Sequence, residues 1–140
     1  QVIGINHNIE KQKEIEKLGA SAAIGSIEDV DFLSATFVGV DVVYTMVPPN
    51  YFAEPDIREY YRKIGDKYAQ AITQANVKRI INLSSYGAHL EKGTGNILGA
   101  HYVENSLNQL SDVDITHIRP TYFYYNLLNL IPMIKTTGSI

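Results

Sequence analysis

Short apolar runs alternate with amphipathic segments along the whole chain. The apolar runs predict strands at residues 1–5, 21–24, 40–47, 77–83 and 113–118. The segments between them carry apolar residues three or four positions apart, which predicts helices at residues 9–18, 28–37, 56–76 and 97–110. Strands that alternate with helices indicate an α/β domain with a parallel sheet. A chain of 140 residues is too short for an eight-stranded α/β barrel, so we expect an open, doubly wound sheet.

Local signals mark the ends of several predicted helices. Asn8 and Asp56 are suitable N-caps, and Gly19 is a suitable C-terminal glycine. In the helix before Gly19, Ile15 and Leu18 are expected to face inward. The apolar and aromatic segment 122–134 is expected to be partly helical, up to Pro132. Residues 48–56 and 86–96 are expected to be loops.

The strand at residues 77–83 is the most informative apolar run. Ile80, Ile81 and Leu83 are nearly continuous, which predicts a strand covered on both faces. The strand ends in Ser84 and Ser85. Ligands bind at the carboxyl ends of the strands in such sheets. Two interpretations of the serines are therefore open: they contact a ligand, or they open a turn and satisfy backbone groups.

Composition excludes several classes of protein. Hydrophobic residues make up 45% and charged residues 19%, which is typical of a folded globular domain. The net charge is −3 with both signs mixed, so no nucleic-acid surface is expected. Cysteine is absent and the four histidines lack carboxylates at ligand spacing, so no metal site is expected. No apolar run is long enough to span a membrane, and we expect a cytoplasmic protein without membrane contact.

Several short motifs follow one another in a characteristic order. They are Asn6-His7-Asn8, Gly25-Ser26-Ile27-Glu28, Val40-Asp41-Val42-Val43, Asn82-Leu83-Ser84-Ser85, and Arg119-Pro120 followed by Phe123 and Asn126. This series resembles the atypical short-chain dehydrogenase/reductase group, and within it the NmrA-like NAD(P)-binding proteins. The resemblance implies a partial Rossmann-like, three-layer αβα fold. It also implies an NAD(P)-binding core at residues 1–120 and the start of a substrate-binding C-terminal segment at residues 121–140.

The Gly-rich turn that holds the cofactor pyrophosphate in this family is not found in the sequence. By the family pattern Gln1 begins the second strand of the sheet, so the pyrophosphate site is expected upstream of residue 1. The residues from Gly138 to Ile140 resemble the entry to a missing substrate-binding part. We therefore expect the sequence to be a piece of a longer protein. If it is the entire molecule, NADPH is expected to bind weakly.

The resemblance also implies which residues contact the cofactor. They are Asn6, His7, Asn8, Lys11, Ser26, Ile27, Thr45, Met46, Val47, Pro48, Leu83, Ser84, Ser85, Pro120 and Tyr122. His7 falls where the family has an arginine and Lys11 adds charge, which favours NADP over NAD. The alternative is that both are ordinary solvated side chains. Ile27 packs either on adenine or in the core, and residues 45–48 either line the cofactor or pack at the core's edge.

The proton-transfer pair of active family members is not visible. The family uses a serine that binds the substrate carbonyl and a Tyr-x-x-x-Lys pair that supplies the proton. Here Tyr102 is followed four residues later by Ser106. Ser85 and Tyr86 are the candidate catalytic residues, with His101 as a further substitute for the tyrosine. Arg119 either pairs with a carboxylate or holds the turn.

Two functions fit these observations. The first is an NAD(P)H-dependent oxidoreductase that acts on a small carbonyl or quinone substrate, and the second is a non-catalytic NADP-sensing regulator. The missing Tyr-Lys pair favours the sensor, whereas the serines and the aromatic residues 122–125 are compatible with the enzyme. A third option, a flavodoxin-like receiver or flavin domain, lacks the acidic cluster that a receiver needs. The expected partners are the dinucleotide and a small-molecule substrate, and the oligomeric state stays open.

Overall fold

The computed structural model describes residues 1–53 and 56–139. Glu54 and Pro55, within the predicted loop 48–56, and Ile140, the last residue of the predicted C-terminal segment, lie outside the described residues. The strands form two parallel sheets: β1 (Ile3–Asn6) pairs with β2 (Ser21–Ile24), and β4 (Arg79–Leu83) lies between β3 (Val43–Thr45) and β5 (Asp114–Ile118). The prediction of an α/β fold with parallel strands is confirmed.

Helices lie between the strands as the sequence predicts, and two more follow β5. They are η1 (Ile9–Lys11), α1 (Gln12–Lys17), α2 (Val30–Phe37), α3 (Ile57–Gln74), η2 (Gly95–Ile97), α4 (Leu98–Asn108), η3 (Tyr124–Leu130) and α5 (Ile131–Thr137). The predicted strand at residues 40–47 is shorter than expected, because only the three residues of β3 pair with β4. Pro48 and Pro49, which follow it, have no N–H group to donate to a neighbouring strand.

The predicted helix caps are confirmed. The Asn8 side chain accepts a hydrogen bond from the Glu10 amide at 2.9 Å, and Asp56 accepts one from the Arg58 amide at 2.6 Å. Gly19 has a φ of +84°, a conformation in which a side chain would be strained. Leu18 was expected to face inward but is 86% exposed, because it lies beyond the last residue of α1.

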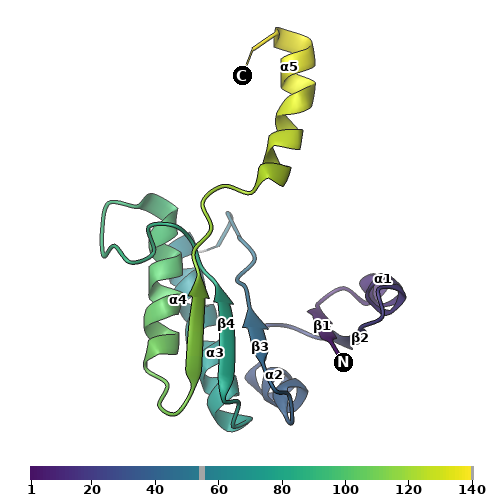
Figure 1. Cartoon of the computed structure of the whole chain (residues 1–140), viewed down its shortest axis with the longest axis vertical. Helices are drawn as coiled ribbons and strands as arrows, with labels where there is room; N and C mark the ends of the chain where they lie inside the picture. Colours follow the sequence, from purple (N-terminus) through teal and green to yellow (C-terminus); the bar gives the residue numbers. More distant parts are fainter. Residues whose placement is uncertain (54–55, 140) are drawn as a thin grey trace.

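The prediction that Pro132 ends the C-terminal helical segment is wrong. Helix α5 begins at Ile131, with Pro132 in its first turn. A proline is favourable there, because the first N–H groups of a helix have no partner within the helix. Together, η3 and α5 stand clear of the sheets (Figure 1), and Tyr124 is 85% exposed.

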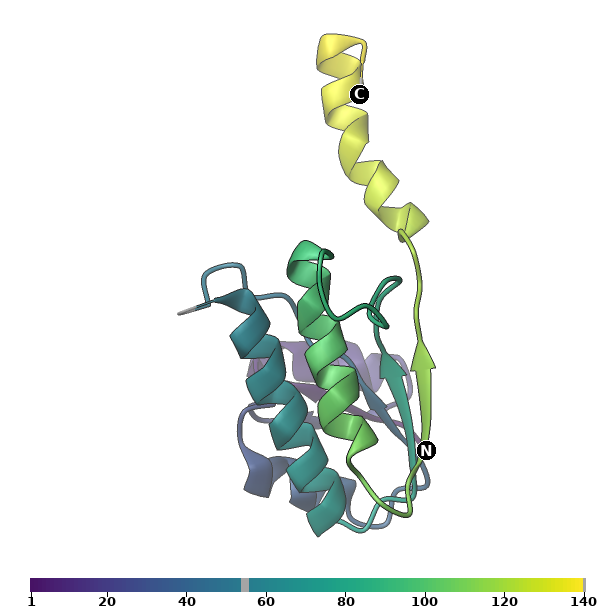
Figure 2. The same cartoon turned by 90° about the vertical axis from the view of Figure 1, so that its left-hand side faces the viewer.

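The core lies between the β3–β4–β5 sheet and the helices α3 and α4 (Figure 2). Its fully buried apolar residues come from α2, α3, β4 and α4: Leu33, Ile64, Ile72, Ile80 and Leu107. A Cβ atom added to Gly65 of α3 would lie 3.0 Å from the Val103 Cα of α4. The absent side chain therefore lets the two helices approach closely.

The other face of the β3–β4–β5 sheet carries no helix within residues 1–53 and 56–139. Tyr44 and Ile118 on this face are 58% and 44% exposed. The prediction that the 77–83 strand is covered on both faces is therefore wrong: Ile80 is buried, but Ile81 and Leu83 are only partly buried.

Helix α1 lies on the β1–β2 sheet instead. Its Ile15 packs on Gly4, whereas Ile5, which points to the opposite face of β1, packs against the core. Helices thus flank the strands on both sides, as expected for a partial three-layer fold.

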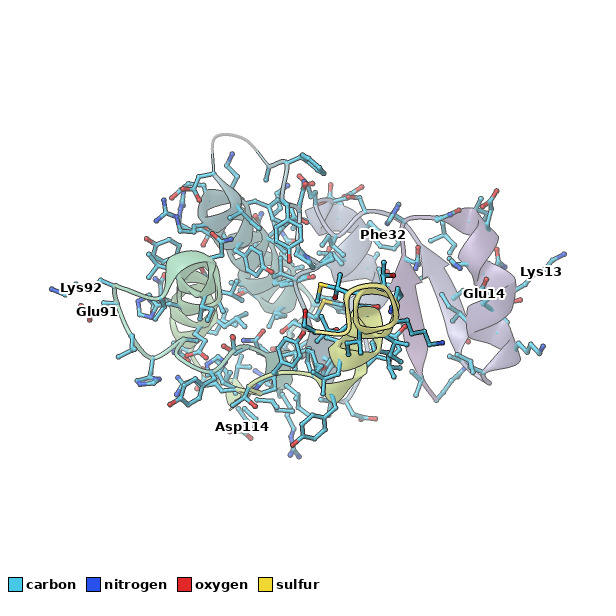
Figure 3. All side chains as sticks on the ribbon, turned by 90° about the horizontal axis from the view of Figure 1, so that it is seen from above. Lys13, Glu14, Phe32, Glu91, Lys92 and Asp114 are labelled. Atoms are coloured by element: carbon cyan, nitrogen blue, oxygen red, sulfur yellow. The ribbon has the colours of Figure 1, made fainter. Side chains whose placement is uncertain are left out.

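Two pairs of charged side chains that Figure 3 labels project at opposite ends of the view from above. Lys13 and Glu14 project from α1, and Glu91 and Lys92 project from the loop between β4 and α4. Phe32 of α2 points toward the β1–β2 sheet, where its ring lies so close to Gly25 that a Cβ there would come within 2.6 Å of it. None of the helices in the described part of the chain is long and apolar enough to cross a membrane.

Candidate functional site

A cavity of about 310 Å³ lies at the carboxyl ends of β3 and β4. It is bounded by the loop after β3, the starts of α3 and α4, and the segment after β5. The predicted residues that line it are Met46, Val47, Leu83, Ser84 and Ser85. The structure thus brings together five of the predicted cofactor contacts at the edge of the sheet where ligands bind in this class of fold.

Most of the cavity wall is apolar. Met46 and Leu83 come from the strand ends, Ile97 from η2 and Phe123 from the segment after β5. The Met46 backbone is held by the Tyr68 hydroxyl of α3, which donates to its carbonyl oxygen at 2.9 Å. Burial raises the pKa of Tyr68 above its usual value, so the hydroxyl keeps its proton. The two serine hydroxyls are polar groups within this apolar surface.

Backbone pairing continues beyond β4 and β5 and fixes the serine segment. The Ser84 amide donates to the Ile118 carbonyl at 2.8 Å, and the Tyr86 amide donates to the Pro120 carbonyl at 2.8 Å. The chain after β4 therefore runs beside the chain after β5, and its residues Ser84 and Ser85 line the cavity.

A buried carboxylate joins Ser84 to Arg119. Glu104 of α4 is only 3% exposed. The Ser84 hydroxyl donates to its Oε1 at 2.5 Å, and Arg119 donates through Nε to Oε1 at 2.8 Å and through Nη2 to Oε2 at 2.5 Å. Arg119 therefore pairs with a carboxylate of the protein itself, one of the two alternatives left open by the sequence.

Burial alone would raise the pKa of Glu104. The hydrogen bonds from Arg119 and Ser84 outweigh this effect, and they hold the pKa below its usual value. The hydrogen bond to Glu104 likewise raises the pKa of Arg119. The pair is thus fully ionised at neutral pH, and the charge of Arg119 is already neutralised within the protein.

A second polar chain crosses the sheet on the side of α3 and α4. The Thr45 hydroxyl donates to Asn82 Oδ1 at 3.0 Å, and Asn82 Nδ2 lies 3.1 Å from His117 Nδ1. His117 Nε2 lies 3.0 Å from Asn108 Oδ1. Because the amide nitrogen can only donate and the amide oxygen can only accept, His117 is neutral with its proton on Nε2. Burial also lowers the pKa of His117, consistent with this form.

This chain explains where Thr45 lies. The predicted contact Thr45 is 2% exposed and points toward the helices, while Met46, the next residue along, lines the cavity. Asn82 is 1% exposed and is satisfied by both neighbouring strands. Thr45, Asn82 and His117 thus link the three strands on the face that carries α3 and α4. The residues that follow Thr45 and Asn82 line the cavity.

The remaining predicted contacts lie outside the cavity lining. The Asn6 side chain accepts a hydrogen bond from the Asn8 amide at 2.8 Å, and both asparagines shape the turn after β1. His7 in this turn is exposed. Lys11 Nζ lies 3.0 Å from the Glu14 carboxylate on the surface.

The other predicted contacts and catalytic candidates are spread around the same strand ends. The Ser26 hydroxyl accepts from the Glu28 amide at 3.1 Å, and Ile27 packs against the core. Pro48, Pro120, Tyr122 and Tyr86 are at the surface or partly buried near the ends of β3, β4 and β5. His101 is 2.8 Å from the Ala88 carbonyl through Nδ1 and 2.9 Å from Asn105 through Nε2. It therefore holds the loop after β4.

Glu104 and Asn82 were missed in the sequence. Glu104 lies between Val103 and Leu107 on the buried face of α4. A carboxylate on such a face implies a cationic partner, so the sequence did contain a signal for this ion pair. Asn82 carried the same kind of signal, as a polar residue within an apolar strand.

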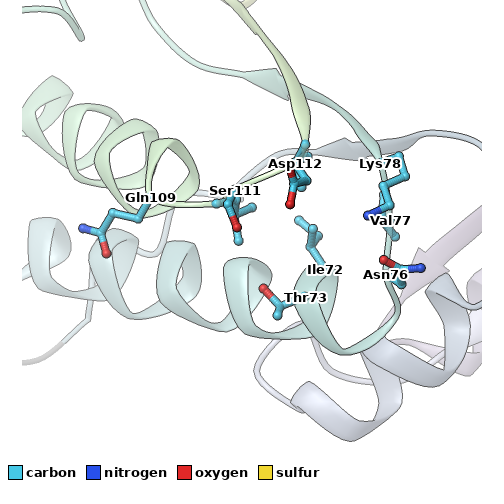
Figure 4. Close-up of a pocket in the computed structure, with 10 residues that line it drawn as sticks. Ile72, Thr73, Asn76, Val77, Lys78, Gln109, Ser111 and Asp112 are labelled. Carbon is cyan, nitrogen blue, oxygen red and sulfur yellow. The ribbon is translucent and has the colours of Figure 1, made fainter.

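A further cavity of about 290 Å³ lies at the opposite, amino ends of β4 and β5 (Figure 4). It is bounded by the ends of α3 and α4 and is lined by polar residues that include Asn76, Lys78 and Asp112. None of the predicted cofactor contacts lies there. Among residues 1–53 and 56–139, no three His, Cys, Asp or Glu side chains gather as metal ligands.

Comparison with known proteins identifies the family. The model of the NAD(P)H-binding family matches residues 1–127. The chain belongs to the NAD(P)H-binding family. This finding confirms the resemblance to NAD(P)-binding proteins noted in the sequence motifs. No curated protein matches the sequence significantly.

Solved structures share the fold at low sequence identity. The triphenylmethane reductase of Citrobacter sp., complexed with NADP(H), has a TM-score of 0.83 and 18% identity over 100% of this chain and 47% of its own. The NADPH-dependent quinone oxidoreductase of Escherichia coli, complexed with NADPH, has a TM-score of 0.78 and 18% identity over 97% and 45%. A nucleoside-diphosphate-sugar epimerase of Staphylococcus aureus has a TM-score of 0.80 and 17% identity over 99% of this chain and 47% of its own. The chain thus spans about half the length of these structures.

Proposed function

We propose that the protein binds NAD(P)H along the carboxyl ends of its strands, with the nicotinamide ring in the cavity at the ends of β3 and β4. The observation that carries this proposal is the cavity itself, where Ser84 and Ser85 lie among apolar walls. In this proposal residues 1–120 form the cofactor-binding core of an NmrA-like protein, and residues 121–140 begin the substrate-binding segment. The cytoplasmic location is part of the same proposal.

The cavity residues suit a flat, uncharged ring. Met46, Leu83 and Phe123 offer apolar contact, and the serines offer hydrogen bonds at its rim. Arg119 and Glu104 neutralise each other, so the cavity has no unpaired charge from this pair. The described residues include no Gly-rich turn for the pyrophosphate, so they account for the ribose and nicotinamide ends of the cofactor only.

The turn after β1 is proposed to contact the adenosine ribose. Asn6 and Asn8 fix its shape, and His7 is exposed within it. No acid stands in this turn, which favours NADP over NAD. Lys11 contributes less than its charge suggests, because Glu14 lies 3.0 Å from its ammonium group.

The proposed reaction is the reduction of a small carbonyl or quinone substrate. When bound, the cofactor supplies the hydride. Ser85, which lines the cavity, orients the substrate carbonyl by hydrogen bonding, and Tyr86, the exposed residue that follows it, is the candidate proton donor. The second candidate is a non-catalytic NADP sensor, which the absence of the Tyr-x-x-x-Lys pair favours. Oxidation of NADPH by a panel of quinones and aldehydes would support the reductase, and tight binding without turnover would support the sensor.

We expect NADPH to bind about tenfold more tightly than NADH, the effect of one charge-assisted hydrogen bond to the 2′-phosphate. The His7→Asp variant should lose or reverse this preference, because its carboxylate repels the phosphate. Fluorescence titration with both dinucleotides measures the ratio. His89→Asp, on the exposed loop after β4, is the matched control and should keep the preference of the parent protein. Equal affinity for the two dinucleotides in every variant would refute the role of His7.

A further inference from the structure

The two serines at the cavity differ in the hydrogen bonds they have left to offer. Ser84 and Ser85 are neighbours in the chain and both line the cavity. A serine hydroxyl has one proton to donate and two lone pairs that accept. What each residue offers to a ligand therefore depends on where its proton is already engaged.

The Ser84 proton is committed to Glu104. The oxygen-to-oxygen distance is 2.5 Å, and the acceptor is an ionised carboxylate that is 3% exposed. Hydrogen bonds to a charged acceptor are short and roughly twice as strong as neutral ones. Arg119 keeps Glu104 ionised, since its two hydrogen bonds lower the pKa of the carboxyl. Ser84 therefore presents only lone pairs to the cavity.

The Ser85 proton is nearly free. Its hydroxyl donates to the Tyr86 carbonyl at 3.4 Å, a distance at the weak end for an O–H donor. A ligand oxygen can replace this contact at little cost. The cavity thus has a fixed acceptor at Ser84 and an available donor at Ser85.

We infer that Ser84 accepts a hydrogen bond from the carboxamide NH₂ group of the nicotinamide, and that Glu104 is the positioning residue that fixes this polarity. The inference rests on the proposed binding of NAD(P)H in this cavity. A carboxamide is the donor group of the nicotinamide ring, whereas a substrate carbonyl can only accept. Ser84 therefore favours a cofactor whose ring carries an NH₂ donor. The neighbouring Ser85 remains available to bind the substrate oxygen.

The test compares NADPH with its 3-acetylpyridine analogue, in which a methyl group replaces the NH₂ and the carbonyl is kept. We expect the parent protein to bind the analogue about tenfold more weakly, because the analogue cannot donate a hydrogen bond to Ser84. Ser84→Ala should bring the two dissociation constants within about twofold of each other, because the acceptor is gone. Ser111→Ala, in the opposite cavity of Figure 4, is the control and should keep the tenfold difference.

The outcomes separate this inference from the proposed function. Binding of both dinucleotides with equal affinity by the parent protein overturns the role of Ser84 and leaves NAD(P)H binding intact. A tenfold difference that persists in Ser84→Ala also overturns it. No binding of either dinucleotide rejects the proposed function and the inference together. The comparison in the parent protein requires no variant to fold, and Ser84→Ala retains both Arg119 hydrogen bonds to Glu104.

Discussion

We expect Arg119→Leu to lower the free energy of unfolding by about 3 kcal/mol at pH 7. The variant leaves the Glu104 carboxylate 3% exposed with Ser84 as its remaining side-chain donor. The loss is at the low end for a buried ion pair, because Arg119 itself is 39% exposed and water screens part of its charge. Urea denaturation of both proteins measures the difference.

The loss should shrink in acid. The folded state of the parent protein lowers the pKa of Glu104, so this pair stabilises the fold above the ordinary carboxyl pKa. That contribution is lost as the pH falls through the lowered pKa, and the two proteins should then converge. Arg62→Leu is the control, since Arg62 pairs with Glu59 and Asp66 on the surface and should cost less than about 1 kcal/mol. Equal losses in the two variants would show that Glu104 does not depend on Arg119.

The second large effect is expected for Asn82→Ala, which should cost about 3 kcal/mol of unfolding free energy. The variant removes a fully buried amide and leaves both the Thr45 hydroxyl and His117 Nδ1 without their partner. An unsatisfied buried polar group costs more than the hydrogen bond itself contributed.

Asn108→Ala is the matched control for Asn82→Ala. Asn108 is exposed at the far end of the same chain, so water can replace it beside His117 Nε2. We expect it to cost less than about 1 kcal/mol in the same denaturation experiment. A cost of Asn82→Ala as small as that of Asn108→Ala would mean that the buried chain does not stabilise the sheet.

Local sequence signals predicted the order and type of the elements. Asn8, Gly19 and Asp56 each act within a few residues, so their capping roles follow from the sequence and are confirmed. Such signals do not predict the burial of a strand face, because burial depends on which elements pack against the strand. Ile81 and Leu83 suggested a strand covered on both faces, yet the helices that pack on it, α3 and α4, both lie on one side.

The site was predicted in part for a similar reason. Strand ends can be placed from the sequence, so the grouping of Met46, Val47, Leu83, Ser84 and Ser85 was accessible through the resemblance. The Glu104 network was not, because it joins α4 to the residues that follow β4 and β5, and their pairing depends on the packed fold. The inward orientation of Thr45 also depends on the register between β3 and β4, which no local signal gives.

Hydrogen–deuterium exchange with and without saturating NADPH tests the central claim most directly, because it locates the ligand on the molecule. The account predicts slower exchange at residues 6–9, 46–48 and 84–87, which follow β1, β3 and β4, and no change at residues 73–78 and 109–113 around the cavity of Figure 4. Protection confined to that opposite cavity, or unchanged exchange at the ends of β3 and β4 with NADPH bound, would contradict it.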